Sequence, residues 1–250
     1  MPSTVDLSQH VEGLREALAA FIDHGGHAGL DAPVPTAPDW TVRQLVAHQG
    51  MVHRWAAANL RGATSHPSDF EAEGLATADP LMWLHDGGLD VIDAIESAPD
   101  DVDAPVFLQD APPPRQFWAR RQCHETTVHS VDALAARLGR VPRADETWVT
   151  REMALDGIDE LLVGFLTRRK SRLRSDEPVT FGVRPNDVRR SWLVRVSTEA
   201  PVVERDVQNH ADVVLEASAE TLYLALWNRS DEIKTDGFDL WRRTARVTWA

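Results

Sequence analysis

The sequence has a single cysteine, no long apolar run and no excess of basic residues, and each shortage excludes a class of protein. Cys123 cannot form a disulfide within the chain, which fits a reducing compartment. No segment approaches the roughly 18 to 20 consecutive apolar residues that a transmembrane helix requires. The first residues, Met1 to His10, lack the basic and apolar segments of a secretory signal, so we expect a cytoplasmic protein without a membrane span.

The formal net charge of −13 argues against binding to nucleic acids. An acidic surface repels the phosphate backbone, whereas nucleic-acid-binding proteins normally carry a basic patch. One local cluster of basic residues runs against this balance. We interpret it as the solvated end of a helix, where the helix dipole favours cations. This basic cluster consists of Arg168, Arg169, Lys170, Arg172 and Arg174.

The composition is that of an ordinary globular protein, with 43% hydrophobic and 26% charged residues. In the first half, apolar residues recur three and four positions apart, which indicates amphipathic helices. Segments rich in glycine, proline and polar residues separate these stretches and are typical of loops, such as Arg61 to Asp79. The pattern predicts a bundle of four helices, at Val5 to Ile22, Thr41 to Leu60, Pro80 to Ser97 and Arg115 to Leu138.

The second half changes to short runs that alternate or contain β-branched residues, which is typical of strands. It also predicts helices at Ala154 to Thr167 and at Ser218 to Trp227. We therefore expect an α+β protein, with a helical bundle at residues 1–142 and a small mixed domain at residues 147–250. The predicted strands are Val179 to Val183, Ser191 to Ser197, Val202 to Val207 and Asp212 to Glu216.

The predicted helix from Arg115 to Leu138 carries ionisable residues on the side that should face the bundle core. Glu125 and His129 are four residues apart, so they lie one turn apart on one face. Extending this stripe adds Arg121 and Asp132, of which Asp132 should support His129 or pair with Arg121. Burying such groups without partners is costly, and a bound metal ion would compensate. The neighbouring apolar face is predicted to consist of Val128, Val131, Ala135 and Leu138.

A third ligand is available on the predicted helix from Thr41 to Leu60. His48 lies among the apolar residues of that helix, so it should point inward, whereas His53 is about 140° further round and should point elsewhere. Two histidines, one glutamate and an open fourth position form a known catalytic zinc arrangement. We therefore predict that His48, Glu125 and His129 bind one divalent metal ion.

Two further residues of the helix from 115 to 138 are predicted not to be ligands. His124 and His129 are five residues apart, whereas the histidines of the zincin motif HExxH are four apart. Cys123 lies about 200° from Glu125 and is interpreted as a small apolar residue. We expect no other inward residue with ligand chemistry on these helices. In the alternative interpretation, His48 and His129 are core histidines satisfied by hydrogen bonds.

Two sequence blocks resemble the mycothiol-dependent maleylpyruvate isomerase family, whose N-terminal domain belongs to the DinB-like metal-binding bundles. They are DWTVRQLVAH, Asp39 to His48, and FWARRQCHETTVHSVDA, Phe117 to Ala133. The likeness continues in DGIDELLVGFLTR, Asp156 to Arg168, and in LYLALWNR, Leu222 to Arg229, so it covers nearly the whole chain. The chain departs from the family at Ser130–Val131, where members often have an aromatic or basic pair, and this leaves the substrate open.

The resemblance implies zinc or another divalent ion on His48, Glu125 and His129, with mycothiol as a thiol cofactor. Zinc lowers the pKa of a bound thiol and so creates a nucleophile at neutral pH. The thiolate would add to an activated double bond in an isomerase, or displace a leaving group in an S-transferase. Arg121 and Arg229 are the predicted catalytic cations for a small, electrophilic, anionic substrate, and Arg229 is also the predicted cofactor-binding residue.

Two other functions stay open at this point. The bundle would also suit a metal-dependent hydrolase that activates water without a thiol, or a protein that binds a metal or small molecule without catalysis. Thiol dependence of turnover separates the first function from these two. In each case we expect small-molecule partners, no nucleic acid or membrane, and a monomer or homodimer.

Overall fold

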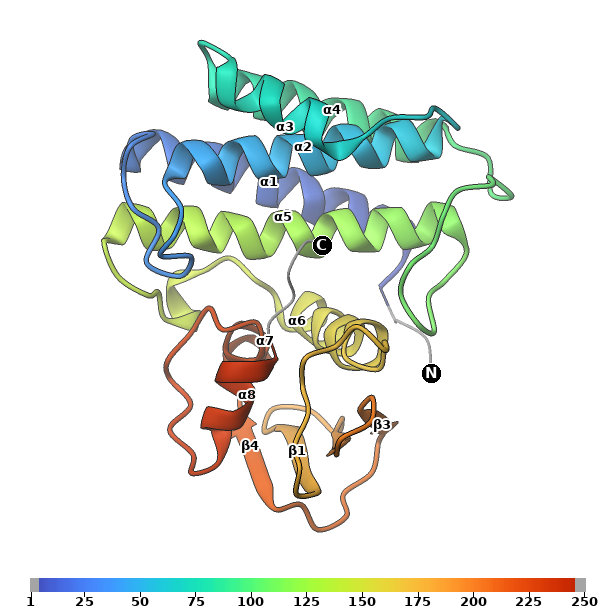
Figure 1. Ribbon diagram of the computed structural model, residues 1–250, viewed down its shortest axis with the longest axis vertical. Helices are drawn as coiled ribbons and strands as arrows, with labels where there is room; N and C mark the ends of the chain where they lie inside the picture. Colours follow the sequence, from blue (N-terminus) through green and yellow to red (C-terminus); the bar gives the residue numbers. More distant parts are fainter. Residues whose placement is uncertain (1–4, 246–250) are drawn as a thin grey trace.

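The computed structural model, which describes residues 5–245, has an α+β fold with a helical bundle on one side and a four-stranded sheet on the other (Figure 1). The four helices predicted for the bundle are present, so the predicted fold class is confirmed. Among the described residues, no helix is long and apolar enough to cross a membrane. The bundle helices are α1 (Leu7–Ala28), α2 (Val42–Leu60), α4 (Pro80–Ser97) and α5 (Pro114–Leu138).

Capping residues explain where the bundle helices begin and end. The Asp6 carboxylate accepts a hydrogen bond from the Gln9 backbone N–H, and the Gln9 side chain accepts one from the Asp6 N–H. Asp79 accepts from the Met82 N–H at 3.1 Å and so caps α4. Gly139 follows α5 at φ 66°, a left-handed conformation that glycine adopts without strain.

The segment predicted as a loop from Arg61 to Asp79 contains a helix, α3 (Pro67–Ala76), so that prediction is wrong. The His66 side chain accepts from the Ser68 N–H, and proline occupies the first helical position. Within α3 only Gly74 is buried. A helix that lies this far out on the surface has no apolar stripe, which is the feature that periodicity detects.

The second half begins with the short helix η1 (Ala144–Glu146), followed by α6 (Arg151–Asp159). The helix predicted at Ala154 to Thr167 is present, but its second part is the π-helix η2 (Glu160–Phe165). The four predicted strands and α7 (Ala219–Leu226) are also present, whereas the short α8 (Phe238–Thr244) was not predicted. The strands are β1 (Val179–Pro185), β2 (Trp192–Val196), β3 (Val202–Arg205) and β4 (Val213–Ala217).

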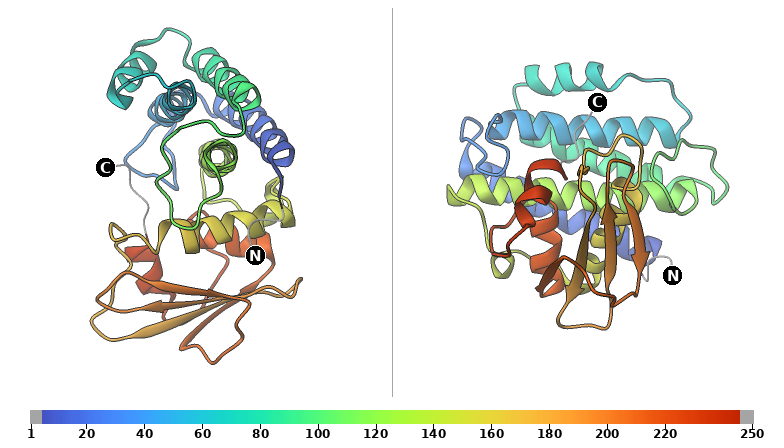
Figure 2. Two further views of the ribbon diagram at one scale, coloured as in Figure 1. Left: turned by 90° about the vertical axis from the view of Figure 1, so that its right-hand side faces the viewer. Right: turned by 60° about the horizontal axis from the view of Figure 1, so that its bottom comes forward.

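The sheet has the strand order β3-β2-β1-β4. Its first three strands form an antiparallel meander, and β4 pairs in parallel with β1. Phe181 of β1 pairs with Val194 of β2 and Val213 of β4, and all three side chains are buried. Figure 2 (left) shows α6 and α7 between this sheet and α5, so these helices cover the inner face of the sheet.

A continuous hydrophobic core runs from the bundle through α6 and α7 to the sheet, and α5 lies at its centre. Every residue from Phe117 to Ala136 is buried. Of the predicted apolar face, only Leu138 is wrong, because it is 38% exposed in the last turn. The domain division at residues 142–147 stays a prediction. Because α5 has no solvent-exposed side over this stretch, each of its ionisable residues needs a partner inside the protein.

Candidate metal centre

Ionisable residues occur on two sides of the middle of α5. Arg120 and His124 contact α6, where Asp156 accepts hydrogen bonds from both. Glu125 approaches His48 of α2 and, one turn further, His129 of α5 itself. The two sides therefore form separate clusters, although they are built from consecutive residues.

His48, Glu125 and His129 bring their ligand atoms within 4.8 Å of one another. The Nε2 atoms of His129 and His48 lie 3.4 and 3.7 Å from Glu125 Oε1. These separations exceed the roughly 2.7–3.2 Å of ordinary hydrogen bonds. Two ligands at about 2.1 Å from a tetrahedral zinc ion are about 3.4 Å apart. The spacing of the three predicted ligands therefore suits a shared metal ion.

The environment holds His48 and Glu125, but not His129, in the form that binds a cation. Burial lowers the pKa of His48, so its imidazole is neutral at pH 7. Burial alone would raise the pKa of Glu125, but Arg121 and the two histidines hold it well below its usual range. Asp132 and Glu125 raise the pKa of His129 against the effect of burial, so a metal ion would displace a proton there.

A chain of hydrogen bonds orients His129. Its Nδ1–H donates to Asp132 Oδ2 at 2.9 Å, which leaves the Nε2 lone pair on the side of Glu125. Arg229 holds Asp132 through two bonds of 2.9 Å, and Thr36 donates to the same carboxylate. Asp132 therefore supports His129, and the alternative pairing with Arg121 is wrong.

Both arginines predicted as catalytic lie beside this cluster. Arg121 donates to Glu125 Oε2 at 2.9 Å and to the carboxylate of Glu160, the first residue of η2. A π-helical turn of this kind frequently accompanies functional sites. The Nη1 of Arg229 donates to the Trp227 carbonyl, so all three nitrogens of this guanidinium are engaged within the protein. Arg229 is thus one residue removed from the candidate ligands.

An aromatic side chain closes one side of the cluster. The Trp40 ring centroid lies 4.9 Å from that of His48 and 6.2 Å from that of His129. The Trp40 ring therefore lies against both imidazoles. An apolar wall of this kind lowers the local dielectric, which strengthens the interaction between a cation and its ligands.

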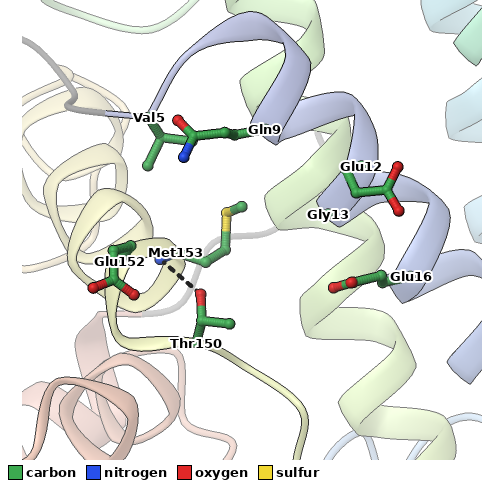
Figure 3. A pocket seen from close by; sticks show the side chains of 8 residues that line it. All are labelled: Val5, Gln9, Glu12, Gly13, Glu16, Thr150, Glu152 and Met153. Atoms are coloured by element: carbon green, nitrogen blue, oxygen red, sulfur yellow. Dashed lines mark hydrogen bonds between the residues drawn. The ribbon is translucent and has the colours of Figure 1, made fainter.

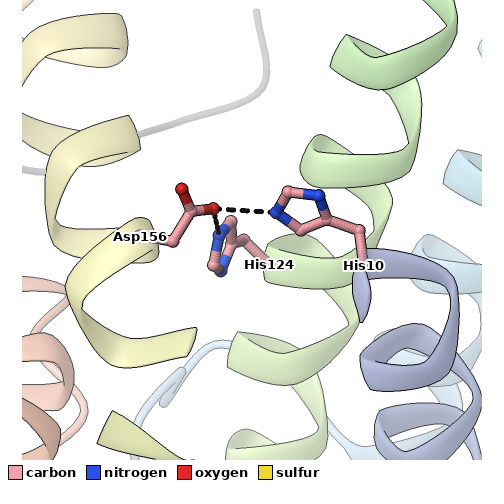
Figure 4. Close-up of side chains that lie close together, drawn as sticks. All are labelled: His10, His124 and Asp156. Atoms are coloured by element: carbon pink, nitrogen blue, oxygen red, sulfur yellow. Dashed lines mark hydrogen bonds and ion pairs between the residues drawn. The ribbon is translucent and has the colours of Figure 1, made fainter. Parts of the chain in front are cut away.

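A second cluster, of His10, His124 and Asp156, was missed by the sequence reasoning (Figure 4). His10 and His124 approach Asp156 Oδ2 at 2.9 and 2.8 Å, and Arg120 donates to the same atom at 2.9 Å. The expectation of no further ligand-type residue facing inward is therefore wrong. The spacing of five residues separates His124 from the face of His129, but α5 is buried on all sides, so His124 faces inward as well.

Three other features lie outside both clusters. His53 is buried and shares hydrogen bonds with Gln49 and Thr126, so it is not among the candidate ligands. Burial raises the pKa of the Cys123 thiol, which fits its prediction as an apolar residue. An open pocket between α1 and α6 is acidic at its edge and contains no residue of either cluster (Figure 3). Its lining includes Glu12, Glu16, Glu152 and Met153.

Comparison with known proteins agrees with this architecture along most of the chain. Residues 11–134 match the mycothiol maleylpyruvate isomerase N-terminal domain, and residues 152–242 match the C-terminal domain of the same family. The chain belongs to the mycothiol-dependent maleylpyruvate isomerase family. The candidate ligands fall within the first match, and Arg121 does too, whereas Glu160 and Arg229 fall within the second.

Two solved structures share the fold of this family member. They are the crystal structures of the mycothiol-dependent maleylpyruvate isomerase and of its histidine-to-alanine mutant, with TM-scores of 0.61 and 0.63. Each match has 13% sequence identity and covers 94% of this chain and 96% of the other. No curated protein matches the sequence.

Proposed function

We propose that this protein is a zinc-dependent enzyme that uses mycothiol to isomerise a small, electrophilic, anionic substrate or, as an S-transferase, to attach the thiol to it with displacement of a leaving group. Membership of the mycothiol-dependent maleylpyruvate isomerase family supports the thiol and the reaction class. The metal would be held by His48, Glu125 and His129. The observation that carries this proposal is the spacing of 3.4 and 3.7 Å between the imidazole nitrogens and the carboxylate oxygen.

The donor set suits zinc and leaves one position for a further ligand. Two imidazoles and one carboxylate fill three positions of a tetrahedral ion, as in catalytic zinc sites. Zinc bound there would lower the pKa of a coordinated thiol and supply a thiolate at neutral pH. The protein supplies the orientation, because Arg121 holds Glu125 while Asp132 holds His129.

The charges around the site also favour one anionic ligand in the fourth position. The carboxylates of Glu125, Asp132 and Glu160 outnumber the guanidinium groups of Arg121 and Arg229 by one. A divalent ion would reverse this balance to one positive charge, which one thiolate or one hydroxide would neutralise. Family membership favours the thiolate over the hydroxide.

We propose that Arg121 and Arg229 serve the reaction from the positions that they occupy. Arg121 acts on Glu125 directly, and Arg229 acts on His129 through Asp132. Both are therefore positioning residues for the metal ligands. Direct contact between Arg229 and the thiol cofactor, as the sequence predicts, would use the two guanidinium N–H groups that its three present hydrogen bonds leave over.

The test is thiol dependence of turnover in the zinc-loaded protein, with maleylpyruvate as substrate and mycothiol as cofactor. We expect turnover only when both zinc and mycothiol are present. Mycothiol should raise the melting temperature of the zinc-loaded protein but not that of the zinc-free protein. His53→Gln is the matched control, because His53 is buried on α2 without joining the cluster. Zinc-dependent turnover without any thiol would instead indicate a hydrolase, and binding without turnover a non-catalytic protein.

A further inference from the structure

Arg168 is the member of the basic cluster that lies over the Phe165 ring. Arg169, Lys170 and Arg172 are exposed, as predicted for a solvated helix end, whereas Arg168 and Arg174 are half-buried. Arg174 donates to the backbone carbonyls of Leu173 and Arg169. The Arg168 guanidinium lies 4.6 Å from the Phe165 ring centroid, and its Nε–H donates a long hydrogen bond of 3.3 Å to the Phe165 carbonyl. No carboxylate of residues 5–245 lies within ion-pair distance of Arg168.

Arg168 is linked to the candidate metal centre through Phe165 and Arg121. The Phe165 ring that it contacts also lies 4.9 Å from the guanidinium carbon of Arg121. Arg121 in turn donates to the candidate ligand Glu125 at 2.9 Å. Burial and the positive charge of Arg121 both lower the pKa of Arg168. Two cations on one aromatic ring repel each other, and an anion beside them would relieve that repulsion.

Trp227 offers a second, independent sign of a missing ligand at the same place. It is only 7% exposed, and its indole N–H has no acceptor among the described residues. Its ring centroid lies 5.6 Å from that of Phe165 and 5.7 Å from the guanidinium carbon of Arg121. Buried indole N–H groups normally have a hydrogen-bond partner, so a ligand oxygen would complete this donor.

We infer that Arg168 and the indole N–H of Trp227 form a carboxylate-binding subsite beside the candidate metal centre. Guanidinium groups bind carboxylates through paired hydrogen bonds. Arg121 and Arg229 are both engaged by protein carboxylates, whereas Arg168 is not. The inference rests on the proposed function, because it places a substrate carboxylate next to the thiolate. It gives the anionic substrate a partner that the two predicted catalytic arginines do not supply.

Binding of maleate to the zinc-loaded, full-length protein tests the subsite without relying on turnover. We expect Arg168→Gln to weaken maleate binding at least tenfold in isothermal titration, while zinc content and mycothiol affinity stay unchanged. Arg172→Gln removes an exposed charge from the same cluster and should bind maleate like wild type. Trp227→Phe keeps an aromatic ring but removes the N–H, and should weaken maleate binding about threefold.

Three outcomes would overturn the subsite. They are equal maleate affinity in Arg168→Gln and wild type, an equal loss in Arg172→Gln, and no maleate binding to wild type. Equal maleate affinity in Arg168→Gln and wild type, together with intact thiol-dependent turnover, would refute the subsite but not the proposed function. Arg168-dependent maleate binding without thiol-dependent turnover would refute the proposed function and leave the subsite standing. Weaker binding of mycothiol by Arg168→Gln, with maleate affinity unchanged, would assign Arg168 to the cofactor instead, which also contradicts the inference.

Discussion

His124 and Glu125 are consecutive residues of α5, yet each belongs to a different cluster of two histidines and one carboxylate. In the cluster of His124, both imidazoles lie within 2.9 Å of one Asp156 oxygen, which is hydrogen-bond distance. In the cluster of Glu125, the corresponding distances are 3.4 and 3.7 Å. The same donor set therefore forms closed hydrogen bonds on one side of α5 and a metal-sized gap on the other.

The charged groups around the two clusters also indicate that the Glu125 cluster, and not the Asp156 cluster, binds a metal ion. Near His124, the carboxylates of Asp156 and Asp159 are matched by the guanidinium groups of Arg120 and Arg205. Burial lowers the pKa of His124, which favours its neutral imidazole. A divalent ion would add uncompensated charge there. We therefore interpret the Asp156 cluster as a joint that links α1, α5 and α6.

The largest expected effect is loss of metal from the Glu125 cluster. A His48→Ala, His129→Ala double variant should fall from about one zinc per chain to below about 0.1, because two of three ligands are removed. Elemental analysis of the purified protein measures this. His10→Gln alters the Asp156 cluster and should retain about one zinc per chain. Stoichiometric zinc in the double variant would sink the ligand assignment.

The next largest effect is a loss of folding stability in Asp156→Ala, with zinc binding unchanged. Asp156→Ala removes the nearer carboxylate partner of the buried Arg120 and leaves only Asp159 at 3.6 Å, and losing one member of such a pair costs about 3–5 kcal/mol. Urea denaturation in the presence of a chelator measures the free energy of unfolding. Folded Asp156→Ala protein should still bind zinc about as tightly as wild type. A loss below about 1 kcal/mol, together with loss of zinc, would reverse the roles of the two clusters.

A smaller effect is expected where Asp132 supports His129. Asp132→Asn should lower zinc affinity about 10- to 100-fold, because the carboxylate that fixes the imidazole is lost. Competition against a chromophoric chelator measures this change. Thr36→Val removes only the hydroxyl that donates to Asp132, so it should change the affinity less. Equal zinc affinity in Asp132→Asn and wild type would show that His129 is held without Asp132.

The smallest effect concerns His53, a buried histidine of neither cluster. Burial, assisted by Arg54, lowers the pKa of His53 to about 3, below the value of about 6.5 expected in the unfolded chain. Protonation therefore favours the unfolded state, and the stability cost grows as the pH falls below 6.5. Between pH 7.5 and 5.5, wild type should lose about 1.4 kcal/mol more than His53→Gln.

Urea denaturation of metal-free wild type and His53→Gln at the two pH values measures this difference. The other histidines titrate in both proteins, so their contributions largely cancel in the comparison. Parallel losses of stability in the two proteins would mean that His53 is protonated as easily when folded as when unfolded.

The sequence predicts best what depends on local spacing. Glu125 and His129 share one helix face whatever the tertiary structure, and His48 follows from the apolar stripe of its own helix. The joint at Asp156 was beyond this reasoning, because His10 and Asp156 are 146 positions apart and meet only when α6 packs on α1. The pairing of Asp132 with Arg229, 97 positions apart, has the same origin. The surface helix α3 was not predicted because it lacks an apolar stripe.

Because α5 lies between the helical bundle and the C-terminal half, both parts of the chain contribute residues to the candidate metal centre. All three candidate ligands lie before residue 142, whereas Glu160 and Arg229, which hold Arg121 and Asp132, lie after it. A chain still emerging from the ribosome would thus possess every ligand before it possesses the residues that hold Arg121 and Asp132 in place. Tight zinc binding would then be acquired late in folding, when the C-terminal segment docks on α5, and would report that assembly of the two segments is complete.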